Sequence, residues 1–155
     1  MQVFEILQDE FQLQTSLPWP VMLTRICGAV IFVGCIGFER ELRKRPAGLR
    51  THMLVALASA CYCIMTIELI SVDYKDNVRM DPIRLIEAVT GGVAFLAAGI
   101  IVFARGEIQG LTTGASLWLA ASIGLAVGLG QWLLAITVTV FGLFITRVLG
   151  ALEGK

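Results

Sequence analysis

The stretch between Glu107 and Arg147 contains no charged residue. A helix that crosses a bilayer needs about 20 predominantly apolar residues, so this stretch is about twice as long as one span requires. The segment Gly128-Leu129-Gly130-Gln131 is the only plausible break within it, because closely spaced glycines favour a turn. The sequence therefore predicts two membrane spans here, at about 112–128 and 131–147, joined by a tight hairpin.

Composition places the remainder of the chain in the membrane as well. Hydrophobic residues make up 57% of the 155 residues and charged residues 15%, and the mean hydropathy of +0.81 is too high for a soluble domain of this size. Three further spans are predicted at about 18–38, 49–70 and 83–104. The first includes Arg25, because the uncharged window that follows it is too short to cross the bilayer.

The predicted fold class is all-α: one polytopic transmembrane domain over residues 1–155, a bundle of about five transmembrane helices with a short amphipathic N-terminal segment. That segment, 1–17, lacks the basic start and the small-residue cleavage site of a signal peptide, so we expect it to be retained. Apolar residues recur in it at helical spacing, which suits a helix lying on the membrane surface. A frayed terminus is the alternative.

Basic side chains concentrate between the first two predicted spans, and they set the predicted orientation. Cytoplasmic loops carry an excess of Lys and Arg, so the loop is expected inside the cell because it holds Arg40, Arg43, Lys44, Arg45 and Arg50. An odd number of spans then predicts an N-terminus outside and a cytoplasmic C-terminus. Because the net charge is zero and the basic run lies between two spans, no nucleic-acid surface is indicated.

An ordered motif runs through the same loop. Gly37-x-Glu39-Arg40-Glu41 is followed by Pro46-Ala47-Gly48-Leu49-Arg50-Thr51-His52, and Asp81-Pro82 and Gly110-Leu111-Thr112-Thr113-Gly114 come further along. Together these motifs resemble the signature of the MgtC/SapB family of bacterial inner-membrane proteins. The resemblance implies about five spans in that membrane and a candidate site at the inner-face hairpins, made of Glu39, Arg40, Glu41, Pro46, Gly48, Arg50, Thr51, His52, Gly110, Thr112 and Thr113.

The resemblance implies a regulatory function. Members of the family are associated with growth under low magnesium, with virulence and with survival inside host cells, and some bind other membrane proteins such as the ATP synthase. Better-studied members add a cytoplasmic C-terminal domain, and the sequence stops just past the fifth span, so we expect a short, membrane-only member. The sequence has one histidine, no cysteine apposed to it and no phosphate-binding loop, so no nucleophile–base set for hydrolysis or phosphoryl transfer is visible. No enzyme is therefore predicted.

The alternative function is a small ion (Mg²⁺) or metabolite transporter. No internal inverted repeat and no Gly/Pro-broken pair of spans of the kind found in secondary transporters is visible in the sequence. Mg²⁺ prefers one or two carboxylates and several waters, so a site among Glu68, Asp73, Asp76 and Asp81 is chemically adequate. Acidic residues in such a loop are usually only solvated, and no cofactor is firmly indicated.

Two predicted helices begin at the inner face with hydroxyl residues near their starts. Thr51 and either Thr112 or Thr113 are expected to cap these helices, and the two N-termini could also meet an anion or the acidic surface of a partner. Capping alone accounts for the three threonines, and we favour it. His52, the only histidine, could sense pH or be an ordinary interfacial residue.

Charged residues from three predicted spans fall in the outer half of the membrane. They form a candidate intramembrane network of Arg25, Glu68, Asp81, Arg84 and Glu87. An intramembrane charge costs roughly 2.5 to 3.5 kcal/mol on insertion scales, which favours pairing of Arg84 with Glu87 and of Arg25 with Glu68 or Glu87. The alternative is that each side chain reaches the interface alone.

Small residues at four-residue spacing indicate close helix contacts. The candidate packing positions are Gly92, Gly99, Gly124 and Gly128. Packing within one bundle is the default interpretation. The sharper one is a homo-oligomer, a dimer being favoured, that associates through Gly124 and Gly128.

Overall fold

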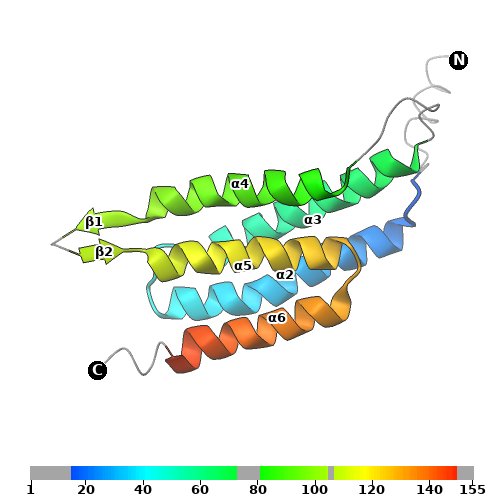
Figure 1. The fold of residues 1–155 in the computed structure, drawn as a ribbon. Coiled ribbons are helices and arrows are strands. Elements are labelled where there is room, and N and C mark those ends of the chain that lie inside the picture. The colour runs from blue at the N-terminus through cyan, green and yellow to red at the C-terminus, as the bar shows by residue number, and fades with distance from the viewer. Residues whose placement is uncertain (1–14, 73–80, 105–106, 150–155) are drawn as a thin grey trace, which may run out of the picture.

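The computed structural model describes residues 15–72, 81–104 and 107–149, so the predicted amphipathic segment lies almost entirely outside the described residues (Figure 1). The chain runs up and down through a helical bundle. Its elements, in order, are α2 (Trp19–Leu42), α3 (Leu49–Ser71), α4 (Ile83–Ile100), β1 (Val102–Ala104), β2 (Glu107–Gln109), α5 (Leu111–Gly128), α6 (Trp132–Phe144) and the π-helix η1 (Ile145–Leu149).

Helix length and apolar composition fit an all-α protein that crosses the membrane several times. Four helices, α2, α3, α4 and α5, are long and apolar enough to span a bilayer. The last described helical stretch, Trp132–Val148, is also apolar but shorter. The first helix continues past the expected end at residue 38 to Leu42, so Glu39 and Arg40 are helical rather than part of a loop.

Helix α5 is the centre of the bundle. Two thirds of its span, 67%, is buried, against 22% for α2, 28% for α3 and 6% for α4. It packs on α2, α3, α4 and α6, whereas α4 contacts mainly α5 (Figure 1). The fold therefore buries most of α5, apart from one face on which Leu111, Trp118 and Ser122 are exposed, and it leaves α4 at the periphery.

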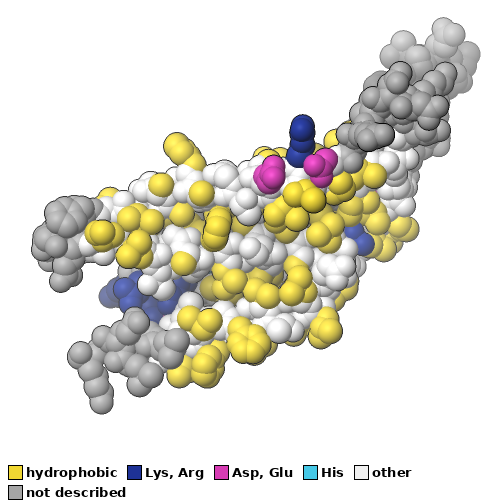
Figure 2. Space-filling model, viewed as in Figure 1, with side chains coloured by type: hydrophobic (Ala, Val, Ile, Leu, Met, Phe, Trp, Pro, Cys, Tyr) yellow, Lys and Arg dark blue, Asp and Glu magenta, His cyan; other side chains and the backbone are white. Residues whose placement is uncertain are grey.

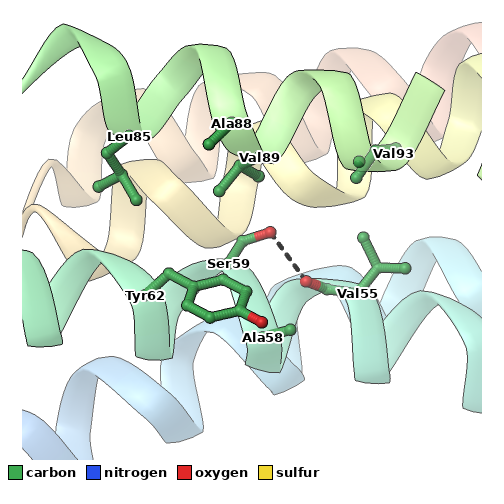
Figure 3. Close-up of a pocket in the computed structure, with 9 residues that line it drawn as sticks. Val55, Ala58, Ser59, Tyr62, Leu85, Ala88, Val89 and Val93 are labelled. Atoms are coloured by element: carbon green, nitrogen blue, oxygen red, sulfur yellow. Dashed lines mark hydrogen bonds between the residues drawn. The ribbon is translucent and has the colours of Figure 1, made fainter. Parts of the chain in front are cut away.

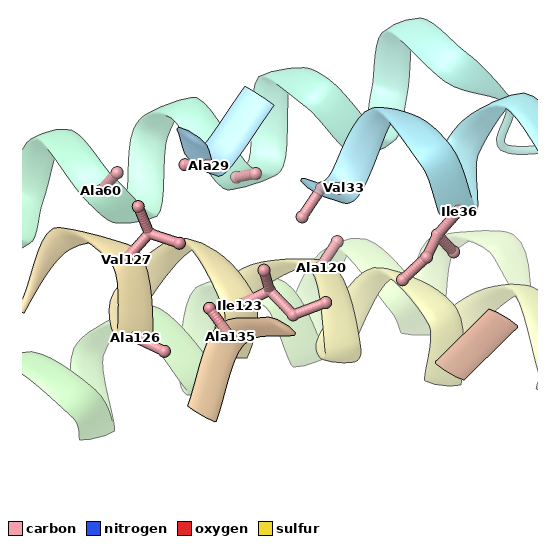
Figure 4. Packing of buried hydrophobic residues seen from close by; sticks show 10 residues of the cluster. Ala29, Val33, Ile36, Ala60, Ala120, Ile123, Ala126, Val127 and Ala135 are labelled. Carbon is pink, nitrogen blue, oxygen red and sulfur yellow. The ribbon is translucent and has the colours of Figure 1, made fainter. Parts of the chain in front are cut away.

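Small and β-branched side chains fill the core. Ala29, Val33 and Ile36 of α2 lie against Ala120, Ile123 and Val127 of α5, with Ala60 of α3 and Ala135 of α6 beside them (Figure 4). Small side chains let helix backbones approach closely, which is how membrane helices gain packing energy where lipid is as apolar as the protein.

The hairpin between α5 and α6 depends on one left-handed glycine. Gly130 has φ 78°, and it donates a hydrogen bond to Val127 O at 2.9 Å, while Gln131 N donates to Ala126 O at 2.8 Å. This pair of bonds satisfies the last carbonyls of α5 in the manner of a glycine C-cap. The uncharged stretch thus divides at Gly128-Leu129-Gly130-Gln131.

The end of the third span differs from the prediction. A helix was expected to residue 104, but α4 ends at Ile100 and a two-stranded antiparallel ribbon follows, with Val102 opposite Gln109 and Ala104 opposite Glu107. The β-branched run Ile100-Ile101-Val102 favours extended backbone over helix. Gly110, at φ 90°, then turns the chain into α5, where a Cβ would lie 2.5 Å from Ile100 O.

The bundle has two ends of different character. We call one the motif end: the turn of residues 43–48, the start of α5 and the π-helix η1 lie there, and Lys and Arg side chains gather beside it (Figure 2). The opposite end carries the start of α2, the end of α3 and the hairpin at residues 129–131. On the face seen in Figure 2, apolar side chains are spread between the two ends.

Candidate functional site

A buried ion-pair cluster occupies the motif end. Glu39 and Arg40 are 7% and 2% exposed, although both are charged. Glu39 Oε2 lies 2.6 Å from Arg40 Nε, and Glu39 Oε1 lies 2.7 Å from Arg43 Nε and 3.3 Å from Arg40 Nη2. One carboxylate therefore bridges two guanidinium groups on the last turn of α2, and we call these three residues the Glu39 cluster.

The Glu39 cluster also binds the last helix that the structure describes. Arg40 Nη2 donates to Thr146 O at 3.3 Å, and Arg43 Nη2 donates to Arg147 O at 2.9 Å. Both carbonyls belong to the π-helix η1, at a helix C-terminus, where carbonyls lack intrahelical partners and cations are favoured. The two arginines thus join α2 to η1 through charge-assisted hydrogen bonds.

His52 is fully buried beside this cluster and bridges α3 to α5. Its Nδ1 lies 2.8 Å from Gly48 O and its Nε2 lies 3.0 Å from Ser116 Oγ. A carbonyl can only accept, so Nδ1 carries a hydrogen. The Ser116 hydroxyl lies between Nε2 and Thr113 O, which is 2.8 Å away, so its single hydrogen can serve either one.

Two glycines let the motif residues approach this closely. A Cβ on Gly37 would lie 2.9 Å from both His52 Cβ and Leu49 Cα, so the backbones of α2 and α3 nearly touch. A Cβ on Gly48 would overlap the carboxylate of Glu41, which accepts a hydrogen bond from Leu49 N at 3.0 Å. Glu41 therefore satisfies the first free N–H of α3 from across the turn.

The predicted hydroxyl caps are not formed. The N-cap positions of α3 and α5 are Gly48 and Gly110, and neither helix start has a hydrogen bond from its cap side chain. The threonines follow the cap residues instead of occupying their positions. Thr51 is half-buried, Thr112 exposed and Thr113 buried with its carbonyl bound to Ser116, while Pro46 and Arg50 are exposed.

The predicted intramembrane network does not assemble either. Arg25 donates to the carbonyl of Gly128 at 2.7 Å, at the C-terminus of α5. Glu68 instead accepts from Ser16 N at 2.8 Å and Leu17 N at 3.0 Å, just before α2. Among the described residues the salt bridges all involve Glu39, so pairing of Arg25 with Glu68 or Glu87 was wrong.

The remaining members of that network lie at the start of α4. Asp81 accepts a hydrogen bond from Ile83 N at 3.0 Å, at the start of the helix, where backbone N–H groups lack intrahelical partners. Arg84 and Glu87 are exposed on the same helix. Asp73 and Asp76, proposed with Asp81 and Glu68 as Mg²⁺ ligands, lie outside the described residues, and no group of three metal-binding side chains is found within them.

The small residues divide into two sets. Gly124 and Gly128 are buried against α3, where an added Cβ would lie 2.6 Å from Ala56 O and 2.7 Å from Cys63 Cβ. They pack within the bundle, so association of two copies through this face was wrong. Gly92 and Gly99 meet nothing within 4 Å, because α4 lies at the periphery.

Three residues of the motif end were missed by the sequence analysis. Ser116 and Thr146 are buried polar residues within apolar helices, and Arg147 entered the prediction only as the end of the uncharged stretch. The available signal was helical phase: Thr113 and Ser116 are three residues apart and therefore share a face of α5.

Comparison with known proteins identifies the family of this chain. The model of the MgtC family matches residues 26–155. The chain is 39% identical over 127 residues to the Escherichia coli K12 protein named "Putative magnesium transporter YhiD", covering 81% of this chain and 59% of that protein. It is 37% identical over 132 residues to protein MgtC of Brucella abortus, covering 84% and 52%.

Protein SapB of Bacillus subtilis is 39% identical over 116 residues, covering 72% of this chain and 49% of SapB. The chain therefore spans about half to three fifths of the length of these relatives. No solved structure matches it. The matched region includes all the helices described above except the first turns of α2, and this membrane protein belongs to the MgtC family.

Proposed function

We propose that this chain is a non-enzymatic regulatory protein of the bacterial inner membrane, linked to magnesium limitation and survival in a host, that acts through contacts with other membrane proteins. The ATP synthase is one candidate partner, and a second copy of the chain is another. The family membership supports the link to magnesium. The basic side chains at the motif end support a cytoplasmic position for that end, with the N-terminus outside.

The observation that carries the proposal is where the polar groups lie. Charged residues of the motif are bound to one another and to helix ends, as in the Glu39 cluster with Thr146 and Arg147. Between the two ends, the described interior consists mainly of Ala, Val, Ile and Leu. A secondary transporter is expected to hold its substrate near mid-membrane with polar groups from broken helices. The described core supports a structural bundle better than a substrate path.

The uncovered flank of α4 supplies a surface for lateral contacts. A groove of about 430 Å³ runs between α3 and α4, lined mainly by apolar side chains such as Val55, Leu85 and Val93, with Tyr62 at one side (Figure 3). Phe95 of α4 is 84% exposed. Small residues beside an open groove allow another helix to approach closely.

A crosslinking experiment in native membranes tests this proposal. A photo-crosslinking amino acid in place of Phe95 is expected to give discrete adducts with other membrane proteins or with a second copy. The matched control replaces Leu133 of α6, which is 79% exposed on another helix. Equal adduct patterns from the two positions would contradict a specific contact surface on α4.

The alternative is transport of Mg²⁺ or a metabolite, which the name given to the Escherichia coli relative favours. Liposomes that contain only this protein, loaded with a magnesium-sensitive dye, separate the two functions. The regulatory proposal expects no Mg²⁺ uptake above that of empty liposomes. Uptake that saturates with Mg²⁺ concentration would establish the alternative and overturn the proposal.

A further inference from the structure

A second groove lies beside the Glu39 cluster, between α2 and the last helical stretch. Its volume is about 460 Å³. Its lining residues are Cys35, Phe38, Glu39, Leu42, Arg43, Leu143 and Arg147. They come from the last two turns of α2, from α6 and from η1, so the groove is at the motif end and outside the closely packed core.

The lining has an apolar part and a cationic part. Cys35, Phe38, Leu42 and Leu143 form the apolar part, and Phe38 and Leu42 are 55% and 67% exposed. The cationic part is formed by Arg43 and Arg147, at the helix ends. An apolar strip that ends in arginines matches the order in which a phospholipid presents acyl chain and phosphate along the membrane normal.

The net charge around the groove is positive. Among the lining residues, Arg43 and Arg147 contribute two positive charges and Glu39 one negative charge, which leaves +1. The buried Arg40, which is bound to Glu39, adds a further positive charge nearby. Both oxygens of Glu39 are already bound, Oε2 at 2.6 Å by Arg40 and Oε1 at 2.7 Å by Arg43. Its charge is therefore directed into the cluster and compensated there, whereas the exposed Arg147 lines the groove without a second carboxylate beside it in the lining.

We propose that this groove binds one anionic phospholipid, with its phosphate at Arg43 and Arg147 and an acyl chain along Phe38, Leu42 and Leu143. Guanidinium groups match phosphate oxygens with paired hydrogen bonds. Basic pockets between transmembrane helices are also known binding sites for anionic lipid headgroups. A free phosphate ion would leave the apolar part of the groove unused, so the proposal commits to a lipid.

Native mass spectrometry and thermal unfolding in a neutral detergent test the proposal. Phosphatidylglycerol is expected to bind at one saturable site and to raise the unfolding temperature, and phosphatidylcholine with the same acyl chains is not. Arg147→Gln should weaken phosphatidylglycerol binding about fivefold, the factor that corresponds to one cationic contact with an anionic lipid. Arg147→Lys, which keeps the charge, should lose less.

The matched control is Arg84→Gln, which removes an exposed arginine at the start of α4, far along the chain from the groove, and should leave phosphatidylglycerol binding unchanged. Equal losses in Arg84→Gln and Arg147→Gln would overturn the proposal, because general charge would then explain the binding. An equal shift with phosphatidylcholine, or with glycerol phosphate that has no acyl chain, would also overturn it.

A second variant protects the test against misfolding. Phe38→Ala removes an exposed apolar side chain of the groove and touches no ion pair of the Glu39 cluster. It is expected to weaken phosphatidylglycerol binding while Arg147 is intact. If Arg147→Gln unfolds in lipid-free detergent, the affinity of Phe38→Ala for phosphatidylglycerol tests the proposal. An unchanged affinity in Phe38→Ala would show that the acyl chain does not occupy the groove.

Discussion

The guanidinium of Arg40 donates a hydrogen bond to the carbonyl of Thr146 at 3.3 Å, although 106 residues separate them in the sequence. The same guanidinium is bound to Glu39, so the buried Glu39–Arg40 pair of α2 is hydrogen-bonded to the backbone of η1. Removing one partner of such a pair leaves a buried charge uncompensated. The Glu39 cluster therefore joins the first and the last described helices, α2 and η1.

Glu39→Gln is expected to destabilise the bundle strongly. The carboxylate accepts from Arg40 at 2.6 Å and from Arg43 at 2.7 Å, and its neutral replacement leaves Arg40 buried without a counter-charge. Breaking a buried pair costs about 3 to 5 kcal/mol when water cannot reach it. Equilibrium unfolding in detergent micelles measures the loss.

Glu87→Gln is the control for Glu39→Gln, because Glu87 is exposed on α4. Its effect on the free energy of unfolding should be within about 0.5 kcal/mol, as for other surface substitutions. If the two variants unfold alike, the buried ion pair contributes nothing that the structure assigns to it.

Ser116→Ala is expected to cost about 1 to 3 kcal/mol, because it leaves the Nε2 atom of buried His52 without its partner at 3.0 Å. Ser122→Ala is the matched control on the same helix. Ser122 is exposed, and its hydroxyl donates only to Trp118 O in the preceding turn. Thermal unfolding of both variants checks the difference, and a larger loss in Ser122→Ala would contradict the bridging role of Ser116.

Hydropathy and helix-breaking residues predicted much of the fold. Long apolar segments indicated the helices, and the glycine pair around Leu129 indicated the last hairpin. Both could be predicted because the length of a membrane span and the position of a glycine turn depend on residues that are close in the sequence. The ribbon after α4 was missed, since a short β-branched run reads equally well as the end of a span. The π-helix η1 has no comparable mark in the sequence.

The candidate site was predicted less completely, for a reason that its contacts make plain. Residue types identified Glu39, Arg40 and His52. The partner of Arg25, however, is a backbone carbonyl, and Arg43 binds one in addition to Glu39; every residue carries such a carbonyl. Charge pattern alone favours carboxylate partners and cannot identify a helix end that the fold places nearby. The same holds for Ser116, whose role depends on the packing of α5 against α3.

Gly124→Ile is expected to destabilise the bundle, and Gly92→Ile is not. A Cβ at Gly124 would lie 2.6 Å from Ala56 O, so the larger side chain should force α5 from α3 and cost about 1 to 3 kcal/mol or more. At Gly92 nothing lies within 4 Å, so the bundle should keep its stability. If copies associate through α4, Gly92→Ile should lower the mass measured by light scattering in detergent.

Orientation can be tested with cysteine labelling in a background in which the four native cysteines are replaced. Lys44→Cys lies at the motif end and Gln131→Cys in the hairpin at the opposite end, and both positions are exposed. A membrane-impermeant thiol reagent added to intact cells is expected to label Gln131→Cys and not Lys44→Cys. The reverse pattern would invert the proposed topology.

Arg25 and Glu68 are expected to act independently, because each has its own backbone partners. Arg25→Gln weakens the contact with Gly128 O at 2.7 Å, a hydrogen bond from a charged group for which about 1.5 to 3 kcal/mol is typical. Glu68→Gln weakens the contacts with Ser16 N and Leu17 N at the entry to α2. A double-mutant cycle on unfolding in detergent measures their coupling, and residues without shared partners should give additive effects. Strong coupling would indicate a direct ion pair between Arg25 and Glu68. The end of the bundle opposite the motif end would then have to differ from the arrangement described above.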